Sequence, residues 1–230
     1  MLQQQLERVH QRIAQACQRC GRVASSVTLV AVTKGVAVDV MREAVGLGVM
    51  DIGENRVQEA RTKRAELAGA DAHVRWHLIG HLQRNKVAHA VELFDAVHSV
   101  DSLELAQALT RAVAGRRKTL EVFVQVNVSG EQTKFGCRPQ ETRLLAQTLL
   151  TCPNVTFAGL MTIAPFSNDP EAARPVFRQL RELKDALVSG LKLPSSMLKL
   201  SMGMSDDFEV AIEEGADLVR IGTALFGDRG

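Results

Sequence analysis

The chain has 230 residues, a mass of 25.1 kDa and a formal net charge of +2, and 46% of its residues are hydrophobic. This length suits one large α/β domain or two small ones, and the near-neutral charge gives no indication of a nucleic-acid or membrane partner. No apolar stretch approaches the ~20 residues of a membrane-spanning helix, and the amino-terminal segment lacks the basic and apolar regions of a secretory signal. We therefore expect a cytoplasmic protein.

The first predicted element is an amphipathic helix over residues 2–20, with an apolar stripe along one face. Cys17 and Cys20 form a C-x-x-C pair on that stripe. This pattern could indicate redox or metal chemistry, but on a helix we interpret the pair as two small core residues. The 4 cysteines of this chain also make no disulfide framework.

A buried strand is predicted next, over residues 28–34, and it ends on a lysine. The residues from Leu29 to Thr33 are aliphatic or β-branched, and Lys34 and Gly35 follow them. One interpretation is a lysine that extends its ammonium group into solvent. The other is chemical: a desolvated amine loses its proton more easily and can form a Schiff base with an aldehyde.

From this point predicted strands and helices alternate without a linker. The remaining strands are predicted at 49–53, 74–80, 94–99, 120–128, 155–162, 197–202 and 217–222. The helices between them are predicted at 37–47, 55–68, 82–91, 102–114, 139–150, 170–189 and 206–214. The strands are rich in Val, Leu and Ile, as strands buried on both faces are. Eight strands, each next to a helix, favour a closed (β/α)8 barrel of the TIM type with an extra amino-terminal helix. We expect one domain over residues 1–230.

The third predicted strand ends near a pair of histidines, His77 and His81. Four-residue spacing brings two histidines onto one metal ion only along a continuous helix. Here Ile79 and Gly80 intervene at a strand end, and no cysteine or carboxylate follows closely to complete a ligand set. We therefore predict no metal site.

Polar groups that could bind an anion follow the last two predicted strands. In a barrel of this type the active site lies at the carboxyl ends of the strands, and the loops after strands seven and eight commonly hold phosphate. Ser201 offers a hydroxyl there and Gly203 allows close approach of the backbone, while Ser205 resembles a helix N-cap. After the eighth strand, Gly222 and Thr223 offer backbone N–H groups and a hydroxyl at a helix start.

Closure of the barrel places the eighth strand beside the first, and therefore places these groups near Lys34. An amine, a phosphate site and the guanidinium of Arg220 together suit a phosphorylated aldehyde, of which pyridoxal 5′-phosphate is the commonest in proteins. A permanent cation against the pyridine nitrogen would keep that nitrogen unprotonated and make the ring a poorer electron sink. The alternative for Arg220 is a structural ion pair at the barrel end.

Several stretches along the whole chain resemble one known family. They are Leu29–Lys34, Gly53–Glu59, Trp76–Lys86, His98–Ser102, Lys134–Gly136, Gly159–Ile163, Leu200–Asp207 and Val219–Gly227. Together they are similar to the pyridoxal phosphate homeostasis proteins, which are single-domain barrels like that of alanine racemase. No departure from the family pattern is seen at these positions.

The resemblance implies a barrel that holds pyridoxal 5′-phosphate as an internal aldimine on Lys34. It further implies that Asn55 lies near the ring hydroxyl and that Arg220 faces the pyridine nitrogen. The residues that it assigns to the phosphate are Ser201, Gly203, Gly222 and Thr223. Members of the family are regarded as carriers or regulators of the intracellular vitamin B6 pool, and PLP-dependent apo-enzymes are the partners that such a role implies.

Two other functions remain open from the residues. One is a weak PLP-dependent amino-acid racemase or lyase, and the other is a class I aldolase that uses Lys34 directly on a sugar phosphate. The chain has no tyrosine, whereas alanine racemase pairs its lysine with a tyrosine from a second domain. We therefore favour a carrier, assign no catalytic residue, and expect a monomer because the predicted barrel is complete.

Overall fold

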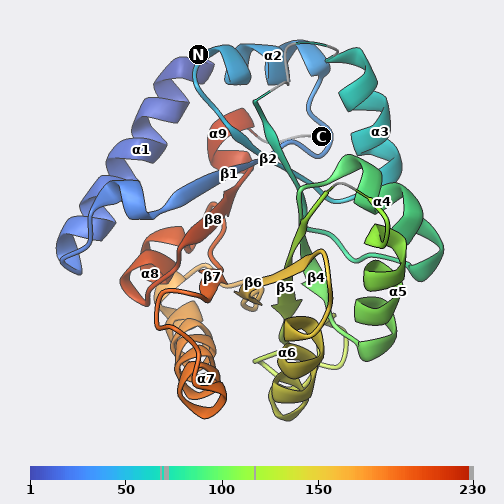
Figure 1. The fold of residues 1–230 in the computed structure, drawn as a ribbon. Helices are drawn as coiled ribbons and strands as arrows, with labels where there is room; N and C mark the ends of the chain where they lie inside the picture. Colours follow the sequence, from blue (N-terminus) through green and yellow to red (C-terminus); the bar gives the residue numbers. More distant parts are fainter. Residues whose placement is uncertain (68, 70–72, 117, 228–230) are drawn as a thin grey trace.

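The computed structural model describes residues 1–67, 69, 73–116 and 118–227, and its strands form a closed parallel barrel in the order β1-β2-β3-β4-β5-β6-β7-β8. The helices surround this barrel on the outside (Figure 1). The strands are β1 (Thr28–Val32), β2 (Asp51–Glu54), β3 (Arg75–Leu78), β4 (Ala96–Val100), β5 (Leu120–Gln125), β6 (Val155–Met161), β7 (Lys199–Ser201) and β8 (Leu218–Ile221). The predicted fold class is thus confirmed.

The helices follow the predicted order, with one addition at the end of the described chain. They are α1 (Leu2–Arg19), α2 (Val38–Gly46), α3 (Val57–Glu66), α4 (Val87–Leu93), α5 (Leu103–Val113), α6 (Thr142–Leu150), α7 (Arg174–Leu191), α8 (Phe208–Glu213) and α9 (Thr223–Phe226). The short α9 was not predicted as a helix of its own. The predicted end of the third helix at residue 68, and residues 228–230 of the predicted domain, lie outside the described residues. No helix in the described ranges is long and apolar enough to cross a bilayer.

Strand β1 is shorter than predicted, and this difference places Lys34 in a turn. The ladder between β1 and β2 reaches Val32, which pairs with Gly53, and the N–H of Thr33 still donates to the Gly53 carbonyl at 2.9 Å. Gly35 then adopts a φ of +69°, a conformation that side chains with a Cβ rarely adopt. The chain therefore leaves the sheet two residues earlier than the apolar pattern indicates.

Helix α1 packs against α8 and α9 and covers the side of the barrel where the first and last strands meet (Figure 1). Its buried face includes Leu6, Val9 and Ile13, which are spaced as one stripe of a helix. Cys17 is buried in this face and Cys20 is half-buried, with its thiol donating to the Ala16 carbonyl at 3.3 Å. Both are free thiols in a packed interface, which agrees with the interpretation of the pair as core residues.

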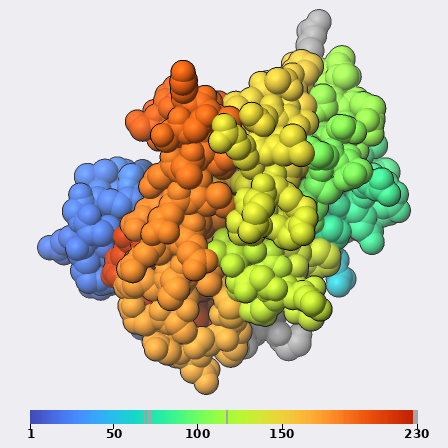
Figure 2. Space-filling view, turned by 90° about the horizontal axis from the view of Figure 1, so that it is seen from below, coloured from blue at the N-terminus to red at the C-terminus, as the bar shows by residue number. Residues whose placement is uncertain are grey.

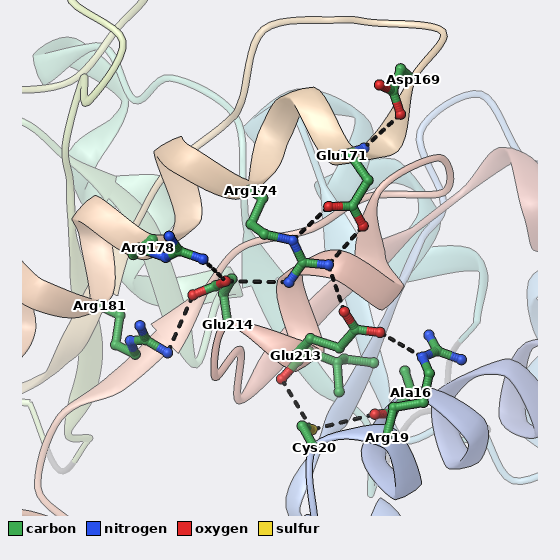
Figure 3. A network of polar contacts seen from close by, with 11 residues as sticks. Ala16, Arg19, Cys20, Asp169, Glu171, Arg174, Arg178, Arg181, Glu213 and Glu214 are labelled. Carbon is green, nitrogen blue, oxygen red and sulfur yellow. Dashed lines mark hydrogen bonds and ion pairs between the residues drawn. The ribbon is translucent and has the colours of Figure 1, made fainter.

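An ionic network joins α7 to the end of α8 (Figure 3). Arg174, Arg178 and Arg181 lie one turn apart on α7 and all reach Glu214, at 3.2, 3.1 and 3.2 Å. Arg174 also binds Glu213 at 2.6 Å. Burial raises the pKa of Glu214, but its hydrogen bonds and attraction to the arginines outweigh burial and lower that pKa below its usual value. The network thus holds a buried carboxylate in its charged form.

Helices α6 and α7 lie side by side on the face seen from below (Figure 2). The guanidinium of Arg143 on α6 donates to the Gly190 carbonyl near the end of α7 at 3.3 Å. The two helices therefore cover this face of the barrel and touch near the end of α7.

The barrel interior is filled by side chains of two kinds. One cluster is apolar and consists of Val30, Phe123, Ala158, Met161 and Leu218. The other is a row of buried or nearly buried polar groups formed by Asp51, His77, His98, Ser201 and Arg220. A barrel of this size is a packed core rather than a pore, so each of these polar groups needs a hydrogen-bond partner inside the protein.

Candidate functional site

A cavity of about 400 Å³ lies at the carboxyl ends of the strands. Its lining comes from the carboxyl ends of seven of the eight strands and from the loops that follow them. The lining residues are Val32, Lys34, Asn55, Ile79, Gly80, His81, Gln125, Phe135, Ile163, Met204, Ser205, Asp206, Arg220, Gly222 and Thr223. This is the position where barrels of this type carry their active sites.

The structure brings most of the predicted site residues to this cavity. Those that line it are Lys34, Asn55, Arg220, Gly222 and Thr223. Ser201 and Gly203 are not part of the lining; both are buried below it. The predicted set therefore divides into residues that line the cavity and residues that are buried beneath it.

Ser201 and Gly203 have close partners within the protein. The Ser201 hydroxyl accepts a hydrogen bond from Arg220 Nη1 at 2.7 Å. Gly203 has a φ of +91°, and a Cβ at this position would lie 2.6 Å from the Cβ of Ala211 on α8. Gly203 thus allows α8 to pack closely, which explains why a glycine is required there without any ligand.

Ser205 lines the cavity, whereas its position in the sequence predicts the N-cap of the helix after β7. The predicted N-cap of α8 is wrong at this position, because the residue at the helix start is Asp207, whose carboxylate accepts from the Met204 N–H at 2.6 Å. The Ser205 hydroxyl instead accepts from the N–H groups of Gly222 and Ala224, at 3.3 and 3.2 Å. It ties the loop after β7 to the turn after β8.

The turn that carries Lys34 rests on a buried ammonium group, that of Lys63 on α3. Lys63 is 7% exposed, and its Nζ donates to the Thr33 carbonyl at 2.5 Å, to Glu54 at 2.9 Å and to Glu59 at 2.6 Å. These three bonds use all three protons of the ammonium group. A buried charge is tolerable here because it is fully hydrogen-bonded and paired with carboxylates.

The same carboxylates hold the residues on both sides of Lys34. The Thr33 hydroxyl donates to Glu54 at 2.6 Å, and the Gly35 N–H donates to Glu59 at 2.6 Å. Burial raises the pKa of Glu54, against the hydrogen bonds from Thr33 and Lys63. Burial also acts on Glu59, but the bonds from Lys63 and Gly35 outweigh it and lower its pKa. We refer to Glu54, Glu59 and Lys63 as the Lys34 clamp.

Arg220 is buried, at 3% exposure, and reaches the cavity from below. Its Nη1 donates to the Ser201 hydroxyl at 2.7 Å and its Nη2 to the Thr162 carbonyl at 2.8 Å. Burial lowers the pKa of Arg220 to about 10, against the attraction of Asp207, so the group stays charged at neutral pH. Both of these hydrogen bonds go to uncharged acceptors, which differs from the structural ion pair considered above.

Two rings of the cavity lining, those of His81 and Phe135, form a stacked pair. The rings of His81 and Phe135 stack with centroids 4.1 Å apart at an interplanar angle of 12°. His81 Nδ1 also lies 3.5 Å from Asp101, whose pKa is raised by burial despite the attraction of His81. His77, in contrast, is buried inside the barrel with its Nε2 at 2.8 Å from Asp51. His81 therefore belongs to the cavity lining, whereas His77 belongs to the barrel interior.

Close backbone contact between Gly80 and Asn55 joins the loops that follow β3 and β2, which we call the glycine lip of the cavity. A Cβ placed on Gly80 would lie 2.2 Å from the carbonyl oxygen of Asn55 and 2.8 Å from its Cα. No side chain can be accommodated at such distances, so glycine is required at position 80 to let the two loops meet. This contact sets the position of Asn55 in the cavity wall.

Comparison with known sequences gives a consistent result over the full chain. Residues 5–230 match the family model described as alanine racemase, N-terminal domain. A curated relative from Aquifex aeolicus, named pyridoxal phosphate homeostasis protein, is 44% identical over 226 residues, which cover 98% of this chain and 97% of that protein.

Comparison with solved structures agrees with the sequence matches. PipY of Synechococcus elongatus, solved with PLP bound, superposes with a TM-score of 0.80 at 37% identity and covers 94% of this chain and 100% of that one. An alanine racemase of Clostridium difficile matches with a TM-score of 0.74 at 16% identity, over 99% of this chain and 56% of that chain. At that identity the second match supports the barrel fold alone.

Proposed function

This chain belongs to the pyridoxal phosphate homeostasis protein family, and from that membership we propose that it binds pyridoxal 5′-phosphate in the cavity at the carboxyl ends of its strands. PipY, at 37% identity, is a structural neighbour solved with this cofactor. We further propose that the amine of Lys34 is the group that joins the cofactor aldehyde. When bound, the cofactor would supply the aldehyde carbonyl, and the Lys34 amine would be the nucleophile that adds to it with loss of water.

The observation that carries this proposal is the composition of the cavity wall. The amine of Lys34, the guanidinium of Arg220 and the donor groups of Gly222 and Thr223 line one space of about 400 Å³. That volume lies within the ~300–1,000 Å³ of small-molecule sites. A phosphorylated aldehyde needs an amine for its carbonyl and hydrogen-bond donors for its phosphate, and this wall offers both.

We assign the residues as follows. The Lys34 clamp holds the backbone on both sides of the amine, so that Lys34 approaches the cavity from a fixed base. The turn of Gly222 and Thr223, which Ser205 ties in place, binds the phosphate with the Thr223 hydroxyl as a donor, and Asn55 binds the ring hydroxyl. Arg220 supplies a fixed positive charge, which keeps a nearby ring nitrogen unprotonated because two adjacent cations repel.

We propose a carrier or regulator of the vitamin B6 pool rather than a catalyst. Removal and return of a proton on opposite faces of an amino acid requires two groups, and this chain has no tyrosine to act as the second. An unprotonated ring nitrogen also makes the cofactor a weaker electron sink. PLP-dependent apo-enzymes are the recipients that this role implies.

The binding proposal is tested by the visible spectrum of the purified protein with added pyridoxal 5′-phosphate, followed by borohydride reduction and peptide mass analysis. We expect a yellow protein and a reduced adduct on Lys34. A protein that stays colourless with excess cofactor would overturn the cofactor assignment. An adduct on another lysine would overturn the assignment of Lys34 alone.

The carrier proposal is tested separately by incubating the loaded protein with L-alanine in deuterium oxide. We expect exchange of the α-proton no faster than with free pyridoxal 5′-phosphate, measured by proton NMR. Exchange well above that control would identify a racemase or lyase. The aldolase alternative predicts a colourless protein with activity on sugar phosphates.

A further inference from the structure

A continuous hydrogen-bonded row crosses the barrel from the amino-terminal rim to the floor of the cavity. It starts at Asp51, the first residue of β2, and His77 Nε2 lies 2.8 Å from its carboxylate. His77 Nδ1 lies 2.9 Å from His98 Nε2, and His98 Nδ1 lies 2.8 Å from the Ser201 hydroxyl. Ser201 in turn accepts from Arg220 Nη1 at 2.7 Å. Each step has the length of a good hydrogen bond.

With both imidazoles neutral, the Asp51 end of the row fixes the direction of every bond in it. A guanidinium can only donate and a carboxylate can only accept. When both imidazoles are neutral, Ser201, which accepts from Arg220, must give its own proton to His98 Nδ1. His98 must then carry its proton on Nε2 and donate to His77 Nδ1, and His77 carries its proton on Nε2 and donates to Asp51. The opposite direction would place a lone pair of His77 against the carboxylate.

The interior around His98 favours this neutral arrangement. His98 is fully buried and stacks on Phe123, with ring centroids 4.4 Å apart. Burial lowers the pKa of His98 well below its ordinary value, and the neighbouring His77 and Arg220 lower it further. A neutral imidazole has its proton on one of its two nitrogens. Which nitrogen carries the proton determines whether each neighbour in the row donates or accepts a hydrogen bond.

We infer that Asp51 is a remote positioning residue for Arg220, acting through the tautomers of His77 and His98 and the orientation of the Ser201 hydroxyl. With its proton committed to His98, Ser201 must present a lone pair to Arg220. Together with the Thr162 carbonyl at 2.8 Å, this lone pair fixes the guanidinium plane at the cavity floor. The inference rests on the proposed function for the identity of the ligand near Arg220. The positions of the protons in the row do not depend on that function.

The first test needs no added cofactor. In the full-length protein labelled with ¹⁵N-histidine, long-range ¹⁵N–¹H correlation spectra distinguish the two neutral tautomers and the imidazolium. We expect His77 and His98 both as neutral Nε2–H forms at pH 7. A proton on Nδ1 of either ring, or a charged His77, would reverse the bonds and overturn the inference.

The second test compares Asp51→Ala with Asp51→Asn. Ala removes the terminal acceptor, whereas the Asn carbonyl can still accept from His77. We expect Asp51→Ala to weaken pyridoxal 5′-phosphate binding about tenfold, the usual effect of losing an outer-shell partner, and to shift the visible absorption of the bound cofactor. Asp51→Asn should restore most of both. Urea unfolding of each variant checks that the fold is intact.

The outcomes separate this inference from the proposed function. Wild-type protein that binds no pyridoxal 5′-phosphate would refute the proposed function, and the tautomer spectra would still decide the row. If wild-type protein binds and folded Asp51→Ala binds equally well, Asp51 has only a structural role and the inference is wrong. Should Asp51→Ala fail to fold, the pair Ser201→Ala and Ser201→Thr makes the same comparison, and equal affinities would refute the role of the row.

Discussion

Lys34 contributes an amine to the cavity but little packing, since its side chain is exposed and follows the end of β1. We predict that Lys34→Ala loses the visible band formed with pyridoxal 5′-phosphate. Its free energy of unfolding should stay within about 0.5 kcal/mol of wild type, as for most surface substitutions. Absorption spectra and urea unfolding measure the two effects independently.

Lys34→Arg is the matched control for charge. A guanidinium keeps the positive charge but is too weakly nucleophilic, being always protonated, to form the same bond. We expect it to behave as Lys34→Ala in the spectrum. A visible band in either variant would show that another lysine holds the cofactor.

Ser205 is the second residue at which a single change is informative. Its hydroxyl joins the turn after β8 to the cavity wall through Gly222 and Ala224. We predict that Ser205→Ala raises the dissociation constant for pyridoxal 5′-phosphate about tenfold, the value of one good hydrogen bond. Titration of absorbance measures it, and unchanged affinity would show that the turn keeps its shape without this hydroxyl.

At the residue scale the predicted segments after β7 and β8 do border the cavity, but Ser205 rather than Ser201 lines it. Ser201 is the last residue of β7 and Ser205 lies in the loop that follows it, and both are short hydroxyl residues. Which one faces the cavity depends on where β7 ends and how tightly α8 packs on Gly203. That is a matter of tertiary packing, which the local pattern does not contain.

The turn between β1 and α2 depends on the clamp beneath it. Removing the ammonium in Lys63→Met leaves two carboxylates and the Thr33 carbonyl without their partner inside the protein. We predict a loss of about 3 kcal/mol in the free energy of unfolding, as when one member of a buried ion pair is removed. Arg61→Met, on the exposed face of the same helix, is the control and should change stability by under about 0.5 kcal/mol. Equal stabilities for the two variants would contradict the clamp.

The network between α7 and α8 predicts a loss of stability in acid. Glu213 and Glu214 both have lowered pKa values in the folded protein, because their arginine partners outweigh burial. A carboxylate whose folded pKa lies below its unfolded value of about 4.3 stabilises the fold above that pH and loses the effect as pH falls through the folded pKa. We expect the free energy of unfolding to fall between neutral pH and about pH 3.

Glu214→Gln tests the same network. It should be less stable than wild type at neutral pH, because three arginines lose a charged partner, and its stability should fall less steeply with acid. Urea unfolding across this pH range measures both. A parallel pH dependence in the two proteins would mean that other carboxylates cause the acid effect.

At the element scale the sequence predicted every strand and all the long helices, because apolar runs separated by amphipathic stretches mark them directly. Several boundaries differ from the prediction, such as the end of β5 at Gln125 and the start of α4 at Val87, and two differences show why. The apolar pattern runs past Val32, whereas the strand ends where its ladder to β2 ends. The short α9 begins directly after β8, and four residues are too few for a periodic pattern to appear.

For the molecule as a whole, closure of the barrel predicts a monomer. Each strand of the described barrel pairs with a neighbour on both sides, so no unpaired edge is left to recruit a second copy. We expect light scattering to give a mass near 25.1 kDa. Twice that mass over a range of protein concentrations would contradict this expectation.

The barrel itself was predictable because a regular alternation of buried strands and helices allows few closed arrangements. The polar row inside it was not. Asp51, His77 and His98 come from three successive strands, and their meeting depends on the register between those strands. One residue of slip would turn each side chain to the opposite face of the sheet.

The contact between Gly80 and Asn55 limits how this cavity could be redesigned. A side chain at position 80 would collide with backbone, so the lip between β2 and β3 cannot be remodelled one residue at a time. The lining also includes Phe135 and Met204, which are 57% and 37% exposed and can be trimmed without opening the core. An engineer who wishes to admit a bulkier pyridoxal derivative should begin there and leave the glycine lip untouched.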